Sequence, residues 1–248
     1  MKETAIAIEN ITKKFEDITA VDGLSLVVNK GELFGLLGPN GAGKTTTINI
    51  LCGLLEPSTG SVKVAGYDAL KEPSKIKELI GVSPQETAVY PHLTGKENIE
   101  LFANLHVISK EKVRKNVDEL LLKLSLQDHA KRKAGKYSGG MMRRINLAMA
   151  LVHDPEIAFL DEPTVGMDPQ SRRAVWDFIK ELKKQNKTVL LTTHYMEEAE
   201  ELCDRVGIID NGKLIALGTP QQLKIKFKAK NLEEVFLQLT GRRIREEV

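Results

Sequence analysis

A glycine-rich run at residues 38–46 constrains this chain more than any other feature. The run reads GPNGAGKTT and fits the pattern GxxxxGK[ST], with an apolar segment directly before it and a helical pattern after it. A loop of this kind turns its backbone N–H groups toward a phosphate group, and the N-terminus of the following helix favours the negative charge. The sequence therefore predicts a phosphate-binding loop between a buried strand and a helix.

Two residues of this loop carry its chemistry. We expect Lys44 to reach the β- and γ-phosphates of a nucleoside triphosphate and Thr45 to ligate Mg²⁺. The remaining backbone would surround the phosphate groups. The predicted binding residues of the loop are Gly38, Pro39, Asn40, Gly41, Ala42, Gly43, Lys44, Thr45 and Thr46.

Short apolar runs predict an α/β fold around the loop. The runs LFGLLG, IAFLDE and TVLLTTH are each followed by a turn or a helical pattern, which is typical of buried parallel strands whose carboxyl ends converge. More alternating segments, separated by turn residues, predict a small antiparallel sheet against that core. The parallel runs span 33–38, 157–162 and 188–194, and the alternating segments span 5–11, 24–32 and 61–68.

The middle of the chain predicts a helical insertion. The β pattern disappears from about Glu86 to Gly135, and the apolar residues of 111–124 recur at helical spacing. Asn211-Gly212 between two apolar runs predicts a hairpin over 206–217. We therefore expect a P-loop NTPase core with a mainly parallel sheet, an antiparallel β subdomain and an inserted α-helical subdomain. Its expected parts are the core (1–85 and 141–222), the helical subdomain (86–140) and a helical tail (223–248).

An acidic pair ends the second apolar run. Asp161 would hold Mg²⁺ opposite Thr45, and Glu162 is placed to act as general base on the attacking water. An adjacent acidic pair is ordinarily a solvated strand end, but here it follows a buried strand in a chain with a phosphate loop. These features alone leave kinases, GTPases and other ATPases open.

The segment YSGGM at 137–141 narrows this choice. Placed between the loop and the acidic strand, it resembles the signature motif of the ABC ATPase family, whose common form is LSGGQ. A hydroxyl and glycine N–H groups at a helix start make a second anion site. The segment departs from the common form in having Tyr at its first position and Met at its last. The residues assigned to this second site are Tyr137, Ser138, Gly139, Gly140 and Met141.

The resemblance extends over nearly the whole chain and implies four further site residues. Phe15 would stack on adenine, and Gln85 would contact the metal site and link the core to the helical subdomain. Asp168, in VGMD, would lie in the dimer-contact loop. His194 would contact the γ-phosphate and orient the attacking water, so it joins Glu162 and Lys44 as a catalytic candidate. The implied metal ligands are Thr45, Gln85 and Asp161.

The composition bears on the partners and on the location. Thirty-six Lys and Arg residues against 34 Asp and Glu leave a formal charge of +2, too small for a field that recruits nucleic acid. We find no run near the ~18 apolar residues of a membrane span and no signal-peptide run at the N-terminus. Cys52 and Cys203 fall in no metal-ligand spacing, which indicates reduced thiols. We expect a cytoplasmic protein, peripheral on the inner face of the cell membrane.

Three classes of function are candidates for this chain. The resemblance implies a homodimer, or a pair with a related ABC subunit, that closes on ATP and Mg²⁺ and drives transmembrane permease subunits on separate chains. YSGGM with the tail NLEEVFLQLTG resembles the branch of ABC-2-type and drug-resistance exporters. The alternative is a soluble ABC ATPase acting on nucleic acid or the ribosome, for which the basic cluster at 131–133 is the only hint, and we expect no nucleic acid. The third class, a nucleotide sensor that binds ATP without hydrolysing it, would lack part of the catalytic set. Here that set is complete, with Lys44, Asp161, Glu162 and His194.

Overall fold

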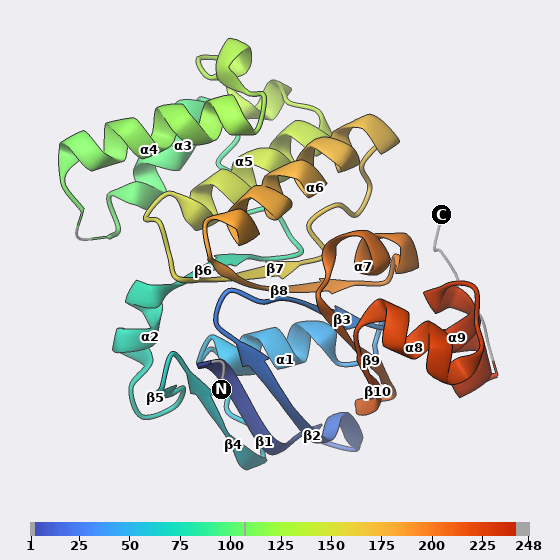
Figure 1. The fold of residues 1–248 in the computed structure, drawn as a ribbon. Coiled ribbons are helices and arrows are strands. Elements are labelled where there is room, and N and C mark those ends of the chain that lie inside the picture. Colours follow the sequence, from blue (N-terminus) through green and yellow to red (C-terminus); the bar gives the residue numbers. More distant parts are fainter. Residues whose placement is uncertain (1–2, 107, 242–248) are drawn as a thin grey trace.

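The central sheet of the computed structural model has six strands in the order β10-β9-β3-β8-β7-β6 (Figure 1). The structure describes residues 3–106 and 108–241. Strands β3, β6, β7, β8 and β9 run parallel along their shared ladders, and β10 pairs antiparallel with β9. The bounds are Leu33–Leu37 for β3, Ile80–Ser83 for β6, Ile157–Asp161 for β7, Thr188–Thr193 for β8, Arg205–Asp210 for β9 and Lys213–Gly218 for β10.

The strands of this sheet are apolar along their length because both faces are covered. In β3, Leu33 and Leu37 pack into the core on the side of the large helices, whereas Phe34 and Leu36 pack into the core beneath the second sheet. Successive side chains of a strand point to opposite faces, so a strand buried on both sides reads as a continuous apolar run. The three parallel strands expected from apolar runs are therefore confirmed.

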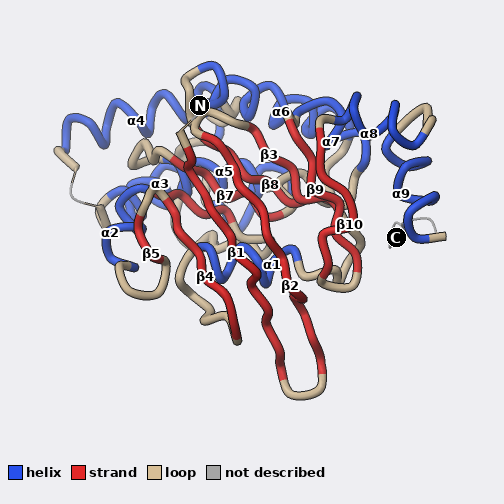
Figure 2. Tube along the Cα trace, turned by 60° about the horizontal axis from the view of Figure 1, so that its bottom comes forward, coloured by secondary structure: helices blue, strands red, loops and turns tan. Residues whose placement is uncertain are grey.

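The second sheet is antiparallel, with the order β2-β1-β4-β5. Its β1–β2 hairpin is long and projects from the body of the molecule (Figure 2). Helix α1 lies between the two sheets (Figure 1). The bounds are Thr4–Phe15 for β1, Ile18–Asn29 for β2, Thr59–Val64 for β4, Tyr67–Asp68 for β5 and Lys44–Leu51 for α1. Together the two sheets confirm the predicted fold class.

Helices α3, α4 and α5 gather on the far side of the central sheet (Figure 1). Thr94 begins α3 with a capping box, in which its side chain accepts from the Glu97 N–H and Glu97 accepts from the Thr94 N–H. Ser109 and Ser138 are the N-caps of α4 and α5, and the side chain of each accepts a hydrogen bond from one backbone N–H of the first turn. The bounds are Pro73–Leu79 for α2, Gly95–Ala103 for α3, Lys110–Lys123 for α4 and Gly139–Leu151 for α5, with short 3-10 turns at Gln127–His129 and Ala134–Lys136.

Four helices follow β7 within the residues that the structure describes up to 241. Their bounds are Pro169–Lys184 for α6, Met196–Leu202 for α7, Pro220–Phe227 for α8 and Leu232–Thr240 for α9. In α9, Leu232, Val235 and Phe236 are buried, so this face of the tail packs on its own chain. Residues 242–248 of the expected tail lie outside the described residues. Within 3–106 and 108–241, no helix has both the length and the apolar character needed to cross a membrane.

Candidate functional site

The phosphate loop connects β3 to α1, and its glycines are required by the backbone. Gly43 has φ 99°, a left-handed conformation, and a Cβ there would lie 2.3 Å from the Ala20 carbonyl oxygen. A Cβ at Gly38 would lie 2.3 Å from the Ile209 carbonyl oxygen. Any side chain at either position would displace backbone. The loop therefore owes its path to close contacts with segments that are distant in sequence.

Replacement of Gly43 by alanine is expected to destabilise the fold. The left-handed backbone costs a residue with a Cβ about 1–3 kcal/mol, and the contact with the Ala20 carbonyl adds to that cost. Gly139→Ala is the matched control, because Gly139 lies at the start of α5 and a Cβ there would meet nothing within 4 Å. Urea unfolding should show a loss for Gly43→Ala and an unchanged or slightly raised free energy of unfolding for Gly139→Ala. Equal stabilities of the two variants would contradict this account.

Lys44 is the first residue of α1, and its ammonium group is enclosed. Its Nζ donates to the carbonyl oxygens of Gly38 and Pro39, at 2.9 and 3.0 Å. The same Nζ lies 3.0 Å from Glu162 Oε1, and both side chains are at most 5% exposed. A buried ammonium group needs a counter-charge. In this arrangement the carboxylate of Glu162 supplies it.

Asp161 and Glu162 end β7 and begin the loop beyond it, and Thr192 of the neighbouring strand β8 fixes both. The Thr192 hydroxyl donates to Asp161 Oδ1 and accepts from the Glu162 N–H at 3.0 Å. The strand register places Asp161 opposite Thr192, and Leu37, the last residue before the phosphate loop, opposite Thr193. The carboxyl ends of three parallel strands thus bring the acidic pair beside the phosphate loop.

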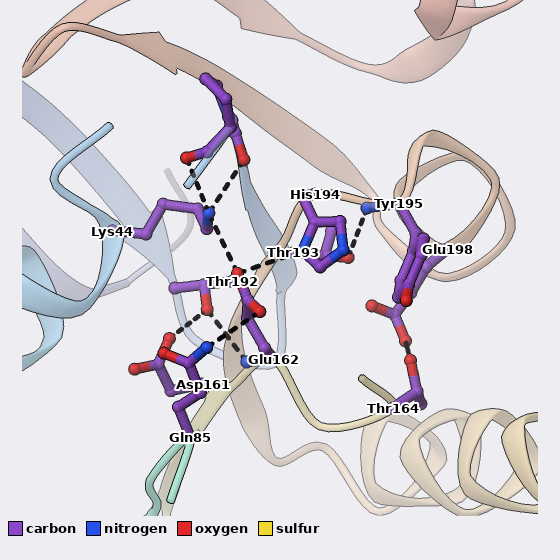
Figure 3. A network of polar contacts seen from close by, with 12 residues as sticks. Lys44, Gln85, Asp161, Glu162, Thr164, Thr192, Thr193, His194, Tyr195 and Glu198 are labelled. Atoms are coloured by element: carbon purple, nitrogen blue, oxygen red, sulfur yellow. Dashed lines mark hydrogen bonds and ion pairs between the residues drawn. The ribbon is translucent and has the colours of Figure 1, made fainter. Parts of the chain in front are cut away.

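The carboxylate of Glu162 lies at the centre of the site (Figure 3). Besides Lys44, its Oε1 lies 3.2 Å from His194 Nδ1, and its Oε2 accepts from Gln85 Nε2 at 3.4 Å. Burial raises the pKa of Glu162, but the hydrogen bond with His194 and the charge of Lys44 outweigh it, so the pKa lies below its ordinary value. The residue is therefore ionised at neutral pH, as a general base must be.

A cavity of about 540 Å³ lies above the loop and this carboxylate. Phe15, at the end of β1, is 45% exposed, so it is not a core residue. None of the described residues that line the cavity belongs to the segment 137–141. The lining residues are Phe15, Ala20, Asn40, Gly41, Gly43, Lys44, Thr45, Thr46, Gln85 and Glu162.

The signature segment begins α5. Ser138 is exposed, and its Oγ accepts from the Met141 N–H at 3.3 Å, which is the N-cap bond of the helix. Tyr137 is only 7% exposed, and its hydroxyl donates to the His129 carbonyl oxygen at 2.6 Å. Met141 packs against the helical core. The side chain of Tyr137 therefore packs within the helical subdomain, and its assignment as a binding residue stays a prediction.

Asp168 begins α6, and its Oδ1 accepts from the Ser171 N–H at 2.9 Å. The hydrogen bonds from Ser171 lower the pKa of this exposed carboxyl group. Gly166 before it has φ 72°, and Met167 is buried. A capping role accounts for Asp168 within one chain, and the predicted role in a dimer contact is a separate proposal.

Two residues of α5 that the sequence analysis missed hold the segment around Gln85. Arg143 donates to the carbonyl oxygens of Pro84 and Gln85. Asn146 donates to Ser83 Oγ at 3.1 Å and to the Pro84 carbonyl at 3.2 Å, and its Oδ1 accepts from the Ala88 N–H. Their spacing of three residues on one helix was the only available signal, and it does not name a partner. Helix α5 is therefore joined by hydrogen bonds to the segment around Gln85.

Comparison with solved structures agrees with this geometry. The structure of an ATP-binding subunit of an ABC transporter superposes with a TM-score of 0.86 at 28% identity, covering 95% of this chain and 99% of that one. The dimeric post-hydrolysis state of the ATP-binding cassette MJ0796, bound to ADP and Pi, superposes with a TM-score of 0.79 at 29% identity, covering 86% and 98%.

Comparison of sequences gives the family. The family model "ABC transporter" matches residues 21–165, which is more than half of the chain. The linearmycin resistance ATP-binding protein LnrL of Bacillus subtilis is 48% identical over 87% of this chain and 69% of its own length. The daunorubicin resistance ATP-binding protein DrrA3 of Streptomyces coeruleorubidus is 44% identical, over 90% and 71%. The Nod factor export ATP-binding protein I of Burkholderia pseudomallei is also 44% identical, over 90% and 73%. The chain therefore belongs to the ABC transporter family, as one of its ATP-binding and ATP-hydrolysing subunits.

Proposed function

We propose that this chain drives an exporter by hydrolysing ATP at the inner face of a cell membrane, together with permease subunits on separate chains. The observation that carries the proposal is the meeting of Lys44, Glu162 and His194 at one end of the central sheet. Relatives named for drug resistance and for Nod factor export support export over an action on nucleic acid or the ribosome.

The cavity geometry supports a role for each residue during turnover. The triphosphate lies along residues 38–46, with adenine against the exposed ring of Phe15. Lys44 exchanges the carboxylate of Glu162 for the β- and γ-phosphates, because these present more negative charge at the same place. Glu162, released from the ammonium group, takes a proton from the attacking water, and His194 orients that water beside the γ-phosphate.

The donor set at this site fits Mg²⁺. This ion prefers oxygen ligands, usually one or two carboxylates together with phosphate and water. Asp161 offers a buried carboxylate, Thr45 an exposed hydroxyl beside the loop, and Gln85 an amide oxygen at the cavity wall. Because Gln85 Nε2 already donates to Glu162, its carbonyl oxygen is the atom suited to a cation. The ion would neutralise charge on the phosphate groups.

The second anion site belongs to the nucleotide of another copy. Ser138, Gly139 and Gly140 line no part of the cavity above Lys44, although Ser138 is exposed at a helix N-terminus. Two different phosphate sites on one chain pair by two-fold symmetry, so each copy would complete the site of the other. The helical subdomain, residues 86–140, would transmit the closing of the two copies on ATP to the permease through Gln85.

A crosslinking experiment tests the shared site. Chains with Ser138→Cys and chains with Asn40→Cys, both in the Glu162→Gln background, are mixed with ATP and Mg²⁺ or with ADP. Asn40 is preferred to Gly41 because Gly41 has φ 78°, which a cysteine would disfavour. Crosslinks between chains are expected with ATP and few with ADP, because only ATP supplies the γ-phosphate that the second copy grips. Gel filtration should show the same difference.

The two natural cysteines should contribute little crosslinking of their own to this test. Cys52 and Cys203 are both buried, and burial raises the pKa of the Cys52 thiol to about 12. Lys184→Cys, exposed near the end of α6, replaces Ser138→Cys in the matched control and should give no ATP-dependent crosslink. Equal crosslinking with ATP and ADP, or no crosslink between the two kinds of chain with ATP, would contradict the shared site.

A further inference from the structure

A fully buried glutamate lies beside the site but has no role in the mechanism above. Glu198 is on α7, four residues after His194, and its side chain is 0% exposed. Its Oε1 accepts from the Thr164 hydroxyl at 2.7 Å and from Trp176 Nε1 at 2.8 Å. Figure 3 shows the carboxyl group of Glu198 and its contact with Thr164 beside His194. An isolated carboxyl group is expensive to bury, so this one requires an explanation.

The groups around Glu198 come from three segments of the active centre. Thr164 lies two residues after Glu162, in the loop that leads to Asp168. Thr193, which also interacts with the carboxyl group, directly precedes His194 at the end of β8. Trp176 lies on α6. Glu198 therefore connects the segment that carries the general base to the segment that carries the histidine.

Burial and hydrogen bonding shift the pKa of Glu198 in opposite directions. Burial raises its pKa, and the hydrogen bonds from Thr164, Thr193 and Trp176 offset this only in part. Within the described residues, neither its Oε2 nor the buried Nε of Arg172 has a hydrogen-bond partner. The contacts through which the carboxyl group joins its neighbours are therefore the hydrogen bonds that its Oε1 accepts from Thr164 and Trp176.

The position of Glu198 relative to Thr192 explains what these hydrogen bonds do. Glu162 Oε1 and His194 Nδ1 are 3.2 Å apart but belong to different segments. On one side, Thr192 of β8 binds the Glu162 N–H. On the other side, Glu198 binds Thr164. The loop after β7 is therefore attached at two points, once to β8 itself and once to helix α7 beyond it. Two attachments that bracket a pair of residues fix both their distance and their relative orientation.

We propose that Glu198 is a positioning residue for ATP hydrolysis, which holds the loop of Glu162 and Thr164 against the segment of His194 through its bond with Thr164. The inference rests on the proposed roles of Glu162 and His194. Loss of the link would let the base and the histidine drift apart without changing the phosphate loop, where ATP binds. A displacement of 1 Å at such a site lowers the rate by up to about 10²-fold.

Three variants of Glu198 and Thr164 test this role in the full chain. Glu198→Met removes both oxygens at similar length, Thr164→Val removes only the hydroxyl, and Glu198→Gln keeps an acceptor oxygen in neutral form. Glu198→Met and Thr164→Val should each lower kcat for ATP by about 10-fold or more, with KM within about 2-fold. Glu198→Gln should restore kcat to near that of the natural chain. An unchanged kcat in Thr164→Val, or a kcat in Glu198→Gln as low as in Glu198→Met, would overturn the proposal.

Two further comparisons separate positioning from support of the core. Thr164→Val combined with Glu198→Met should lower kcat no further than Glu198→Met alone, since both cut the same link. Trp176→Phe removes the indole donor to Glu198 Oε1 and should reduce stability with little change in kcat. A Trp176→Phe variant as slow as Thr164→Val would make Glu198 a core residue only. If Glu198→Met does not fold, Thr164→Val decides the question.

The same assays distinguish this inference from the proposed site. A fully active Glu162→Gln would remove the assigned base, and with it the pair that Glu198 is said to position. An inactive Glu162→Gln beside fully active Glu198→Met and Thr164→Val would leave the site intact and refute only the positioning role.

Discussion

Replacement of Glu162 by glutamine is expected to lower the rate of ATP hydrolysis by about 10²- to 10⁴-fold, the usual contribution of a positioned general base. The amide has the shape of the carboxylate but cannot accept the proton of the attacking water. His194 and Lys44 outweigh the effect of burial and keep the pKa of Glu162 below its ordinary value, so the natural residue is ionised and ready to act. Binding should not suffer, because the substitution releases Lys44 from the ion pair that occupies it.

Two measurements on this variant separate chemistry from binding. Phosphate release gives the rate of hydrolysis, and equilibrium titration with ATP and Mg²⁺ gives the affinity, which should equal or exceed that of the natural chain. Glu201→Gln is the matched control, since Glu201 pairs with Lys180 on the surface, away from the site. Retained turnover in Glu162→Gln would mean that another residue activates the water.

Lys44→Ala is expected to weaken ATP binding by about 30-fold or more, the effect of removing one partner of a buried charge pair, which costs roughly 2–5 kcal/mol. Lys44 is the ammonium group enclosed by the loop carbonyls, and alanine leaves the phosphates only neutral N–H donors there. The variant also removes a charge that lowers the pKa of Glu162, so that pKa should rise. The weaker binding of ATP acts against hydrolysis.

Isothermal titration with ATP and with ADP measures the loss. The reduction should be larger for ATP, because Lys44 is expected to reach the γ-phosphate, which ADP lacks. Lys75→Ala serves as the control, since Lys75 is an exposed residue paired with Glu72. Natural ATP affinity in Lys44→Ala would rule out the assigned site.

The local patterns of the sequence were sufficient to predict the main strands and helices and the residues that act within one segment. The loop at 38–46 has its glycines, lysine and threonine in consecutive positions, so its conformation and its ligand can be predicted together. The buried strands could be recognised because a strand covered on both faces is apolar throughout. The hairpin at Asn211-Gly212 is a local turn, and β9 and β10 formed on either side of it.

Tertiary structure alone decided how these segments meet. The partner of Lys44 depends on the register of β3, β8 and β7, and this register brings Glu162 Oε1 to 3.0 Å from Lys44 Nζ. Tyr137 was expected at the ligand and lies in the core, because its neighbours come from other turns of the helical subdomain. The contacts of Thr192, Arg143 and Glu198 join residues 22 to 59 positions apart along the chain. A side-chain hydrogen bond over such a separation leaves no periodic pattern in the sequence, since it depends on where two surfaces pack and not on spacing.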